Sequence, residues 1–374
     1  MHVCEDIPQL PKIELGRTGY KLSRLAIGGF HQVEITCDIV NEVVDAFLEL
    51  GGNYIETARG YGAGASEEKL GRVLKGRRDQ VVLTSKSGNP TADGIRKDLE
   101  ATLENLQTDY LDFYFYHGVG SEEQIGKIAG PGGAAEGLAK AKDEGLLRGG
   151  AGLSSHRPWI YKKAIDRLDL SLILIWSNYL EDMYLPEISS DIIPYALEKG
   201  VGVTAMKPLG DGFLYRSVED AFRWALGGGA EILVSGMNSP DHVRQAAAAI
   251  AKGPINDDER QRILREAPEL GRYVCRQCGQ CCDELMEAFR LEGYVDRQML
   301  DYLEHDPAQY ALRKNLAGWF NLAETGRERF AEKGSDAEWL IRSGASVGCP
   351  YGIDVERKAR LATAKLSGSG PNRI

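Results

Sequence analysis

Short apolar runs alternate with helical patterns from residue 25 onward, and this alternation constrains the fold more strongly than any other feature of the chain. Eight runs have the length and apolar character of buried strands, namely 25–27, 53–57, 81–85, 111–116, 150–153, 172–176, 202–206 and 231–235. The helical patterns between them include 38–50, 66–74, 95–106, 133–144, 191–199 and 218–225. Eight strands, each followed by a helix, are the repeat of a (β/α)8 TIM barrel. We therefore predict an α/β fold of this class.

Two further patterns favour the barrel over a doubly wound open sheet. No G-x-G-x-x-G phosphate loop follows the first strand, where a dinucleotide-binding open sheet would carry it. Residues 13–15 and 21–23 flank a Gly-rich turn and predict a β-hairpin ahead of the barrel. We expect this hairpin to cap the bottom of the barrel, at the N-terminal ends of its strands.

The barrel pattern ends near residues 252–257, where a Gly-Pro pair interrupts the last helix. Beyond this point the chain consists of long, charged, helical stretches. These features predict a barrel domain of residues 1–257 and a helical domain of residues 258–374.

Four cysteines in the predicted helical domain have the spacing of iron–sulfur ligands. Cys275, Cys278 and Cys281 stand in C-R-Q-C-G-Q-C, and the remote Cys349 is followed by Pro350. Three thiolates at two-residue gaps, completed by a distant Cys-Pro, are typical of ferredoxin-type segments that hold a 4Fe-4S cluster. We predict such a cluster, and we expect its loss to loosen the domain, because ligand binding and folding are coupled.

Alternatives for these thiols remain open from the spacing. A zinc site usually has two pairs of ligands, and only one half of this motif forms such a pair. Reduced thiols without a ligand are the other alternative. Cys282 is adjacent to Cys281, so either could be the third ligand.

Charge and apolar pattern exclude two classes of partner. The net charge of −10 at pH 7 argues against nucleic acid, whose phosphates require a basic surface. No apolar run approaches the roughly twenty residues of a spanning helix, so no membrane is expected. No export signal is visible in residues 1–11, so we expect a cytoplasmic, reducing compartment, in which cysteines rarely form disulfides. Cys4 and Cys37, outside the motif, are expected to be free thiols.

Polar residues follow the predicted barrel strands where an active site would form. Active sites of such barrels lie at the C-terminal ends of the strands. The residues at these ends are Glu56, Arg59 and Tyr61 after strand two, Lys86 after strand three, His117 after strand four, Ser154, Ser155 and His156 after strand five, Ser177 and Asn178 after strand six, and Lys207 after strand seven.

Four of these residues form a set suited to proton transfer. A lysine ammonium such as that of Lys86 lowers the pKa of a nearby phenol such as Tyr61 by stabilising the phenolate. Glu56 would hold the lysine, and His117 would donate a hydrogen bond to a substrate oxygen. Each residue alone has a structural explanation, as a loop tyrosine, a solvated charge or a core histidine. Their joint placement on adjacent strand ends favours chemistry.

The chain resembles an aldo-keto reductase of the branch that carries a C-terminal ferredoxin-like iron–sulfur segment. The resemblance rests on L-G-R-T-G-Y-K-L-S-R-L, G-G-N-Y-I-E-T-A-R-G-Y-G, S-E-E-K-L-G, T-S-K, Y-L-D-F-Y-F-Y-H, G-L-S-S-H and G-V-G-V-T-A-M-K-P-L-G-D-G. These stretches span essentially the whole barrel, and the cysteine motif covers the tail. The resemblance implies an NAD(P)H-dependent oxidoreductase that reduces a carbonyl group or oxidises the corresponding alcohol.

The resemblance assigns catalytic roles to the four residues. Tyr61 would be the general acid, Lys86 its partner in setting the pKa, and His117 the residue that orients the substrate. The family has an aspartate where this chain has Glu56, one methylene longer. The longer side chain can still reach Lys86, but it can also place the carboxylate differently or let it act as a base.

The resemblance also assigns residues to the nucleotide. Ser154 and Asn178 would hold the nicotinamide carboxamide. The loop that contains Lys207, Leu209 and Gly212 would lie along the pyrophosphate.

The adenosine end of the expected nucleotide site departs from the family. The helix from Ser239 would receive a phosphate at its N-terminus. This chain has His242 where an arginine is common and Ala246 where an asparagine is common, with Arg244 nearby. NADP is therefore the expected nucleotide, and NAD, or weak binding of either, remains open.

Three functional hypotheses follow. The first is a reductase of small polar or sugar-like carbonyl compounds, suggested by the polar residues expected at the barrel mouth, Arg59, His156, Trp176, Tyr179 and Asp211. The second is a redox-neutral lyase or isomerase that uses Glu56 as a base. The third is a binding module that senses redox state through its cluster. In any of them the cluster would be structural or would pass single electrons to a partner protein, and the single set of four ligands favours the structural role.

Overall fold

The computed structural model describes residues 8–296, 322–334, 336–344 and 347–368. Within-chain contacts divide the protein into two compact units, each described here by itself. The barrel unit comprises Met1–Asn178 and Glu187–Asn256, and the C-terminal unit comprises Tyr179–Pro186 and Asp257–Ile374. Cys4, expected to be a free thiol, lies outside the described residues. The domain boundary expected from the sequence stays a prediction.

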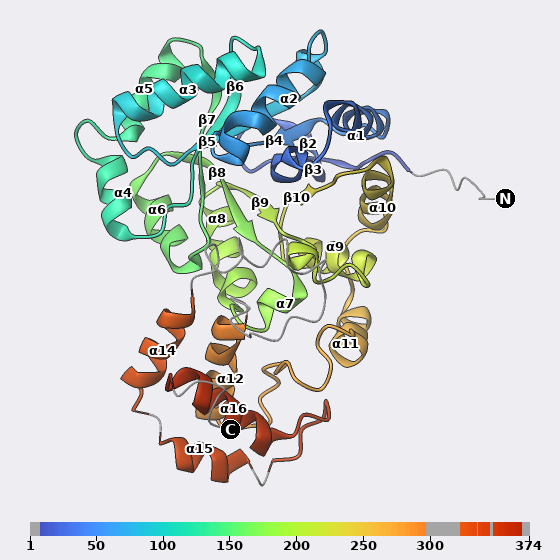
Figure 1. Cartoon of the computed structure of the whole chain (residues 1–374), viewed down its shortest axis with the longest axis vertical. Coiled ribbons are helices and arrows are strands. Elements are labelled where there is room, and N and C mark those ends of the chain that lie inside the picture. Colours follow the sequence, from blue (N-terminus) through green and yellow to red (C-terminus); the bar gives the residue numbers. More distant parts are fainter. Residues whose placement is uncertain (1–7, 297–321, 335, 345–346, 369–374) are drawn as a thin grey trace, which may run out of the picture. The chain divides into compact units, whose positions relative to one another are not determined.

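Eight parallel strands close into a barrel in the barrel unit, which confirms the predicted (β/α)8 architecture (Figure 1). The strands follow one another around the barrel in chain order, and the last pairs with the first. They are β3 (Leu25–Gly28), β4 (Tyr54–Glu56), β5 (Val82–Ser87), β6 (Leu111–Tyr116), β7 (Leu147–Ser154), β8 (Leu170–Trp176), β9 (Gly202–Met206) and β10 (Ile232–Gly236). Their C-terminal ends form one edge of the barrel, here called the rim.

Four helices of the barrel unit, α1, α3, α4 and α10, begin at short polar side chains that cap them. Thr36, Thr91, Ser121 and Ser239 each accept a hydrogen bond from the backbone N–H three residues later. Such caps satisfy a donor that the first helical turn leaves without a partner. The helices are α1 (Cys37–Glu49), α2 (Ala65–Val73), α3 (Ala92–Leu106), α4 (Glu122–Ala129), α5 (Ala134–Asp143), α6 (Tyr161–Arg167), α8 (Ile193–Glu198), α9 (Val218–Gly227) and α10 (Pro240–Ala251).

The predicted hairpin is present as β1 (Lys12–Glu14) and β2 (Lys21–Ser23), paired antiparallel. Its Leu15 and Leu22 are fully buried and belong to the apolar cluster inside the barrel. Gly16 has a φ of +48°, and a Cβ built there would lie 2.5 Å from the backbone nitrogen of Gly202, at the start of β9. The hairpin therefore closes the end of the barrel opposite the rim.

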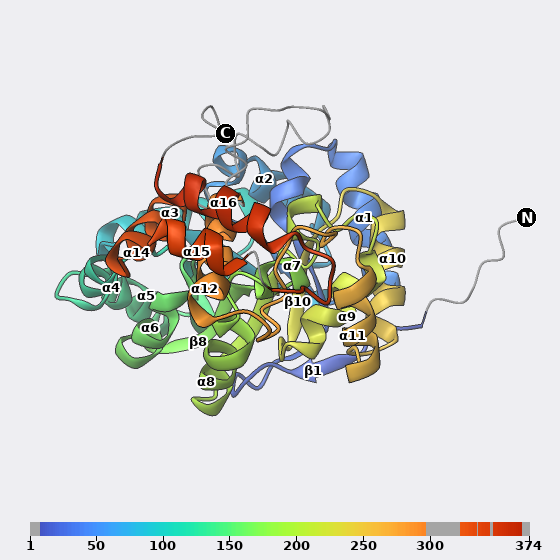
Figure 2. The ribbon, with the colours of Figure 1, turned by 90° about the horizontal axis from the view of Figure 1, so that it is seen from below.

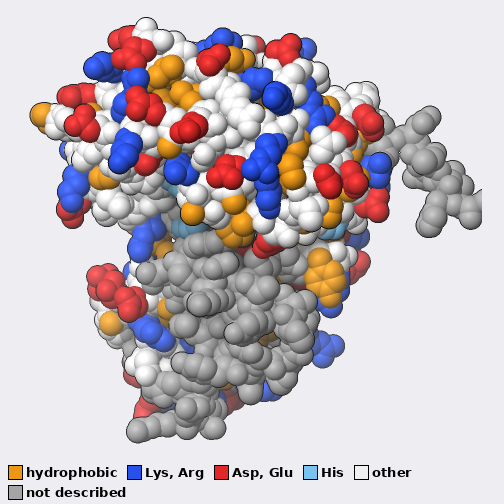
Figure 3. All heavy atoms as spheres, turned by 45° about the horizontal axis from the view of Figure 1, so that its top comes forward, with side chains coloured by type: hydrophobic (Ala, Val, Ile, Leu, Met, Phe, Trp, Pro, Cys, Tyr) orange, Lys and Arg blue, Asp and Glu red, His pale blue; other side chains and the backbone are white. Residues whose placement is uncertain are grey.

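The C-terminal unit is helical. Its helices are α7 (Tyr179–Asp182), α11 (Asp257–Glu266), α12 (Asp283–Asp296), α14 (Ala323–Glu332), α15 (Ala337–Gly344) and α16 (Val355–Leu366). Helix α12 packs against α14 and α16, and α15 packs against α16 (Figure 2). Within the described residues, no helix combines the length and apolarity needed to cross a bilayer. On the face of the barrel unit visible in Figure 3, acidic and basic side chains are intermingled.

Candidate active site

The ends of β4 and β5 bring a carboxylate, an ammonium and a phenol together at the rim. The Nζ of Lys86 lies 2.6 Å from Oε1 of Glu56. The same Nζ donates hydrogen bonds to the Thr57 carbonyl oxygen at 2.8 Å and to the Tyr61 hydroxyl at 3.0 Å. Lys86 is fully buried and Glu56 is 3% exposed, so the ammonium has exchanged water for three protein oxygens. Adjacent parallel strands produce this convergence, since their C-terminal ends meet at one edge.

The ring of Tyr61 is held between two aromatic side chains. Phe30 and His117 both meet it edge to face, with centroid distances of 5.3 and 5.7 Å. Tyr61 opens a short 3-10 turn (Tyr61–Gly64) after β4, in which Gly62 and Ala63 have φ values of +62° and +54°. This turn points the phenol back toward Lys86.

Burial dominates the proton affinities of this group. It raises the pKa of the Tyr61 phenol well above its usual value, and the Glu56 carboxylate raises it further. This direction is opposite to the one expected from the Lys86 charge alone, because burial and the Glu56 charge both raise the pKa of Tyr61. Burial also lowers the pKa of Lys86, and the Glu56 charge opposes this shift. Tyr61 is therefore a neutral phenol at neutral pH, able to donate a proton.

His117 is neutral at neutral pH. Burial lowers the pKa of its imidazole to about 3, and the nearby Lys86 ammonium acts in the same direction. A neutral imidazole offers one N–H donor and one ring-nitrogen acceptor. It can orient a substrate oxygen, while Tyr61 remains the proton donor of the pair.

Residues expected at the nicotinamide follow β7, β8 and β9. Ser154, which ends β7, is buried, and its Oγ accepts a hydrogen bond from the Gly118 backbone N–H at 3.4 Å. Asn178 follows β8 and donates from Nδ2 to the Lys207 carbonyl oxygen at 2.9 Å. Lys207 forms an ion pair with Asp211 at 2.9 Å. The structure thus joins Asn178 to the expected pyrophosphate loop.

That loop has an unusual backbone. Lys207 and Asp211 both have φ values of +59°, in the left-handed region that residues other than glycine rarely adopt. Leu209 precedes a 3-10 turn that contains Gly212, which is exposed and has a φ of +92°. The Gly212 backbone is therefore accessible to a ligand.

The N-terminus of α10 has the cap expected from the sequence. The Ser239 hydroxyl accepts a hydrogen bond from the His242 backbone N–H at 3.3 Å, and His242 itself is exposed. Arg244 Nη1 lies 3.0 Å from Asp241 Oδ1. This pair reduces the positive charge available to a phosphate at the helix end.

Two expectations about the barrel mouth need correction. Tyr179 is fully buried, and its hydroxyl donates to Oε2 of Glu269 at 2.8 Å, so it does not line an open mouth. Trp176 is 2% exposed and packs against the His156 ring with a centroid distance of 5.3 Å. Phe30, which contacts the Tyr61 ring, was not expected at the site from the sequence. Its position after the first barrel strand was the available signal.

The comparison with family models decides the family. Residues 24–221 match the model of the aldo/keto reductase family. The chain belongs to this family. A solved aldo-keto reductase from Bacillus halodurans is 26% identical, with a TM-score of 0.59, and the alignment covers 68% of this chain and 95% of that one.

The chain is also similar to curated relatives over part of their length. An uncharacterized oxidoreductase of Bacillus subtilis is 29% identical, and the alignment covers 46% of this chain and 56% of the relative. An L-galactose dehydrogenase of Arabidopsis thaliana is 33% identical over 55% of this chain and 68% of the relative. A Schizosaccharomyces pombe aldo-keto reductase whose name specifies NADP(+) is 30% identical over 46% of this chain and 53% of the relative. The chain thus spans between about half and two thirds of the length of these relatives.

The four predicted cluster ligands line one cavity of the C-terminal unit, here called the four-cysteine cavity. Cys275, Cys278, Cys281 and Cys349 all border it. Cys282 does not border it. Among the described residues, no three His, Cys, Asp or Glu side chains are grouped closely enough to hold a single metal ion.

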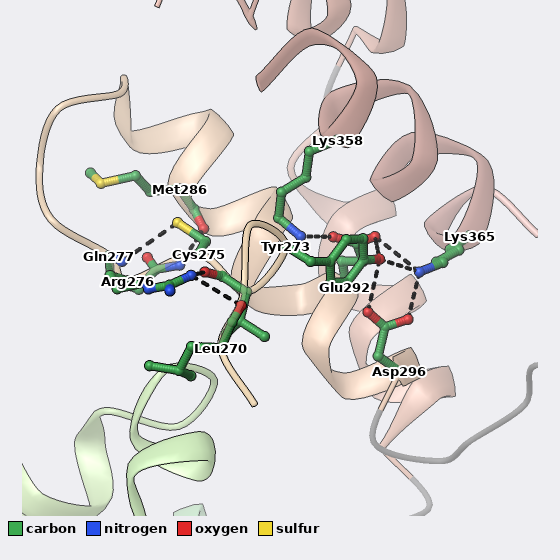
Figure 4. A network of polar contacts seen from close by, with 11 residues as sticks. Leu270, Tyr273, Cys275, Arg276, Gln277, Met286, Glu292, Asp296, Lys358 and Lys365 are labelled. Atoms are coloured by element: carbon green, nitrogen blue, oxygen red, sulfur yellow. Dashed lines mark hydrogen bonds and ion pairs between the residues drawn. The ribbon is translucent and has the colours of Figure 1, made fainter. Parts of the chain in front are cut away.

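A network of hydrogen bonds fixes the loop that carries the first cysteines (Figure 4). The buried Arg276 guanidinium donates to the carbonyl oxygens of Leu264, Leu270, Gly271 and Val274. These four acceptors lie between the last turn of α11 and the first cysteine. The loop is therefore held by hydrogen bonds of its own.

A second network ties α16 to α12 (Figure 4). Lys358 Nζ lies 2.6 Å from Glu292 Oε2, and Lys365 Nζ lies 3.0 Å from Glu292 Oε1 and 2.6 Å from Asp296 Oδ1. The Tyr273 hydroxyl donates to Glu292 at 2.5 Å. Burial opposes ionisation of Glu292, but the two lysines outweigh it and lower the pKa of this carboxyl. The network brings together residues that precede and follow the cysteine segments in the chain.

Proposed function

We propose that this protein is an NAD(P)H-dependent oxidoreductase that reduces a small carbonyl compound, or oxidises the corresponding alcohol, at the rim of the barrel. The observation that carries the proposal is the contact of Lys86 Nζ with the Tyr61 hydroxyl at 3.0 Å and the Glu56 carboxylate at 2.6 Å. This arrangement suits a phenol that gives up a proton and returns to its neutral state. Membership of the aldo/keto reductase family supports the same activity.

In this proposal four side chains have distinct roles in the transfer of the proton. The bound nicotinamide nucleotide supplies the hydride. Tyr61 donates its proton to the carbonyl oxygen, and the Lys86 ammonium stabilises the phenolate that remains. Glu56 neutralises and positions Lys86, and the neutral His117 orients the substrate oxygen. In the direction of alcohol oxidation, the phenolate accepts the proton.

NADP is the nucleotide proposed, with Ser154, Asn178, Lys207, Leu209, Gly212, Ser239 and His242 as its binding residues. The accessible Gly212 backbone and the capped end of α10 fit a pyrophosphate and an adenosine phosphate, respectively. A relative whose name specifies NADP(+) supports this choice. NAD is the alternative, since Asp241 pairs with Arg244 and so reduces the positive charge that a 2′-phosphate would need.

The substrate proposed is a small polar or sugar-like carbonyl compound. The support is the relative named L-galactose dehydrogenase, whose name specifies a sugar. A redox-neutral lyase or isomerase reaction would need Glu56 as a free base. That residue is instead 3% exposed and paired with Lys86, so we place this alternative second.

We further propose that the four-cysteine cavity holds a 4Fe-4S cluster. The support is that the four thiols with ferredoxin-type spacing border one cavity. Such a cluster supplies one-electron chemistry when bound. A structural role is proposed, with electron transfer to a partner, or redox sensing, as the alternative.

We propose a cytoplasmic, reducing compartment, in keeping with six described cysteines that do not pair with one another as disulfides.

The proposed reductase activity is tested by an anaerobic fluorescence titration with NADPH and NADH, followed by turnover of a panel of carbonyl compounds. We expect Tyr61→Phe to lower kcat by about 10²–10⁴-fold with unchanged nucleotide affinity. The matched control Tyr195→Phe removes a phenol hydroxyl on α8 and should keep full activity. Unchanged turnover in Tyr61→Phe would exclude this tyrosine as the general acid.

A further inference from the structure

A short segment of the barrel's own sequence belongs to the C-terminal unit. Residues 179–186 lie in the chain between β8 and α8, yet their contacts group them with residues 257–374. The segment begins directly after Asn178, which is a proposed nucleotide-binding residue of the barrel unit. A peptide bond therefore joins that residue to the C-terminal unit.

The segment is anchored at both of its tyrosines. The Tyr179 hydroxyl donates to Oε2 of Glu269 at 2.8 Å. Arg290 Nη1 donates to the Tyr184 carbonyl oxygen at 3.3 Å, and two hydrogen bonds from Arg290 to Glu287, at 2.7 and 2.9 Å, hold that guanidinium. Both tyrosines are buried, so the segment is part of the interior of the C-terminal unit.

The ring of Tyr184 packs directly on the backbone of α12. A Cβ built on Gly293 would lie 1.9 Å from Cδ1 of Tyr184, and the three atoms nearest to it all belong to this ring. Only glycine at this position leaves room for the ring. The fit of the segment thus depends on the position of α12.

The same helix borders the four-cysteine cavity. Met286 and Phe289 of α12 line the cavity, and α12 begins directly after Cys282. Arg290 and Gly293, within the next turn, hold Tyr184. If a change in the cavity moves or loosens α12, the position of Tyr184 therefore changes too, because Arg290 and Gly293 of the same helix contact this residue.

We infer that residues 179–186 couple the C-terminal unit to nucleotide binding: when α12 is ordered by a filled cavity, the segment is fixed, and Asn178 is held in the position that binds the nicotinamide. The inference rests on the proposed function for the identities of the two ligands. Coupling between binding sites is reciprocal, so the nucleotide also stabilises the filled cavity. Tyr179 and Tyr184 act as positioning residues, through Asn178.

A hydrogen bond within the barrel unit is the competing explanation for how Asn178 is held in position. Its Nδ2 donates to the Lys207 carbonyl oxygen at 2.9 Å. If this bond alone fixed Asn178, the state of the C-terminal unit would not affect nucleotide affinity. The two expectations differ in one measurable quantity, the change in nucleotide affinity when the cavity is emptied.

The affinity test compares NADPH and NADH binding to the full-length protein before and after iron chelation. We expect chelation to weaken binding of the preferred nucleotide at least about fivefold, the lower range of typical coupling. Tyr179→Phe should reduce this difference, and Tyr195→Phe, which removes a phenol hydroxyl on α8, should not. Equal affinities with and without iron would overturn the inference and leave the proposed function intact, whereas absence of nucleotide binding in the iron-loaded protein would overturn both.

A second measurement depends on neither ligand. In native-state hydrogen exchange along a urea series, amides of residues 179–186 should lose protection together with those of α12, because the two form one cooperative unit. Loss of protection together with β8 would instead assign the segment to the barrel and overturn the inference. Gly293→Ala provides a further check, since it should release the segment while β8 stays protected.

Discussion

Replacing Lys358 with methionine removes one positive charge from the interior of the C-terminal unit. Lys358 is 4% exposed, and its Nζ lies 2.6 Å from a Glu292 oxygen that is equally shielded from water. The same ammonium lies 4.0 Å from the centroid of the Tyr273 ring. Methionine has a similar length and volume, so the substitution changes charge far more than it changes packing.

The expected cost follows from the groups that remain. Removing one partner of a buried ion pair typically costs about 3–5 kcal/mol, because the other charge stays buried without compensation. Glu292 retains Lys365 at 3.0 Å and the Tyr273 hydroxyl at 2.5 Å. We therefore expect the lower end of that range, about 3 kcal/mol, in the free energy of unfolding of the C-terminal unit.

Urea unfolding followed by hydrogen exchange of α12 and α16 measures this free energy. Lys333→Met is the matched control within the same unit, because Lys333 is 54% exposed and its Nζ lies 3.2 Å from Glu287 Oε1; it should cost no more than about 1 kcal/mol. The double variant Lys358→Met/Glu292→Leu removes both charges and should recover most of the loss. Equal costs for Lys358→Met and the control, or a double variant less stable than the single one, would refute the reasoning.

Three further predictions concern the two candidate sites. Glu56→Asp shortens the carboxylate that holds Lys86 and should preserve or raise carbonyl reduction; a fall in kcat of more than about tenfold, or about 1.4 kcal/mol, would show that the longer side chain is required. Cys278→Ser should abolish the visible absorbance of the anaerobically purified protein, and Cys282→Ser, outside the cavity, should retain it; the reverse pattern would show a wrong ligand set. Because burial lowers the pKa of His117 from 6.5 to about 3, the unfolded chain takes up this proton first as the pH falls below 6.5, so stability is lost between these values. His117→Gln should lessen that loss in urea unfolding from pH 6.5 to pH 4, and parallel curves for both proteins would contradict the shift.

The barrel was predictable because its signal is repeated and local. β6 (Leu111–Tyr116) and β9 (Gly202–Met206) occupy the expected ranges, since short apolar runs between helical patterns mark buried parallel strands. Helix α3 begins three residues earlier than predicted, at Ala92, because the Thr91 cap starts it before its apolar periodicity appears. A helix cap is marked in the sequence by a single polar residue, whereas the apolar spacing of a helix is repeated over several residues.

The proximity of Glu56, Tyr61 and Lys86 followed from strand order, but their electrostatics did not. The sign of the Tyr61 pKa shift depends on burial and on a second charge at close range, and both are properties of three-dimensional packing. The placement of Tyr179 in the C-terminal unit could not be predicted from the sequence either. Its partner Glu269 lies far along the chain, and no periodic pattern marks such a contact.

Residues 179–186 are synthesised well before the part of the chain on which they pack. Their buried tyrosines leave the ribosome with the barrel, but Gly293, on which Tyr184 packs, is synthesised roughly a hundred residues later. At about 5–20 residues per second, the segment waits roughly 5 to 20 s for its partner. During this interval Tyr179 and Tyr184 of the nascent chain lack Glu269 and Gly293, the residues that they contact in the folded protein.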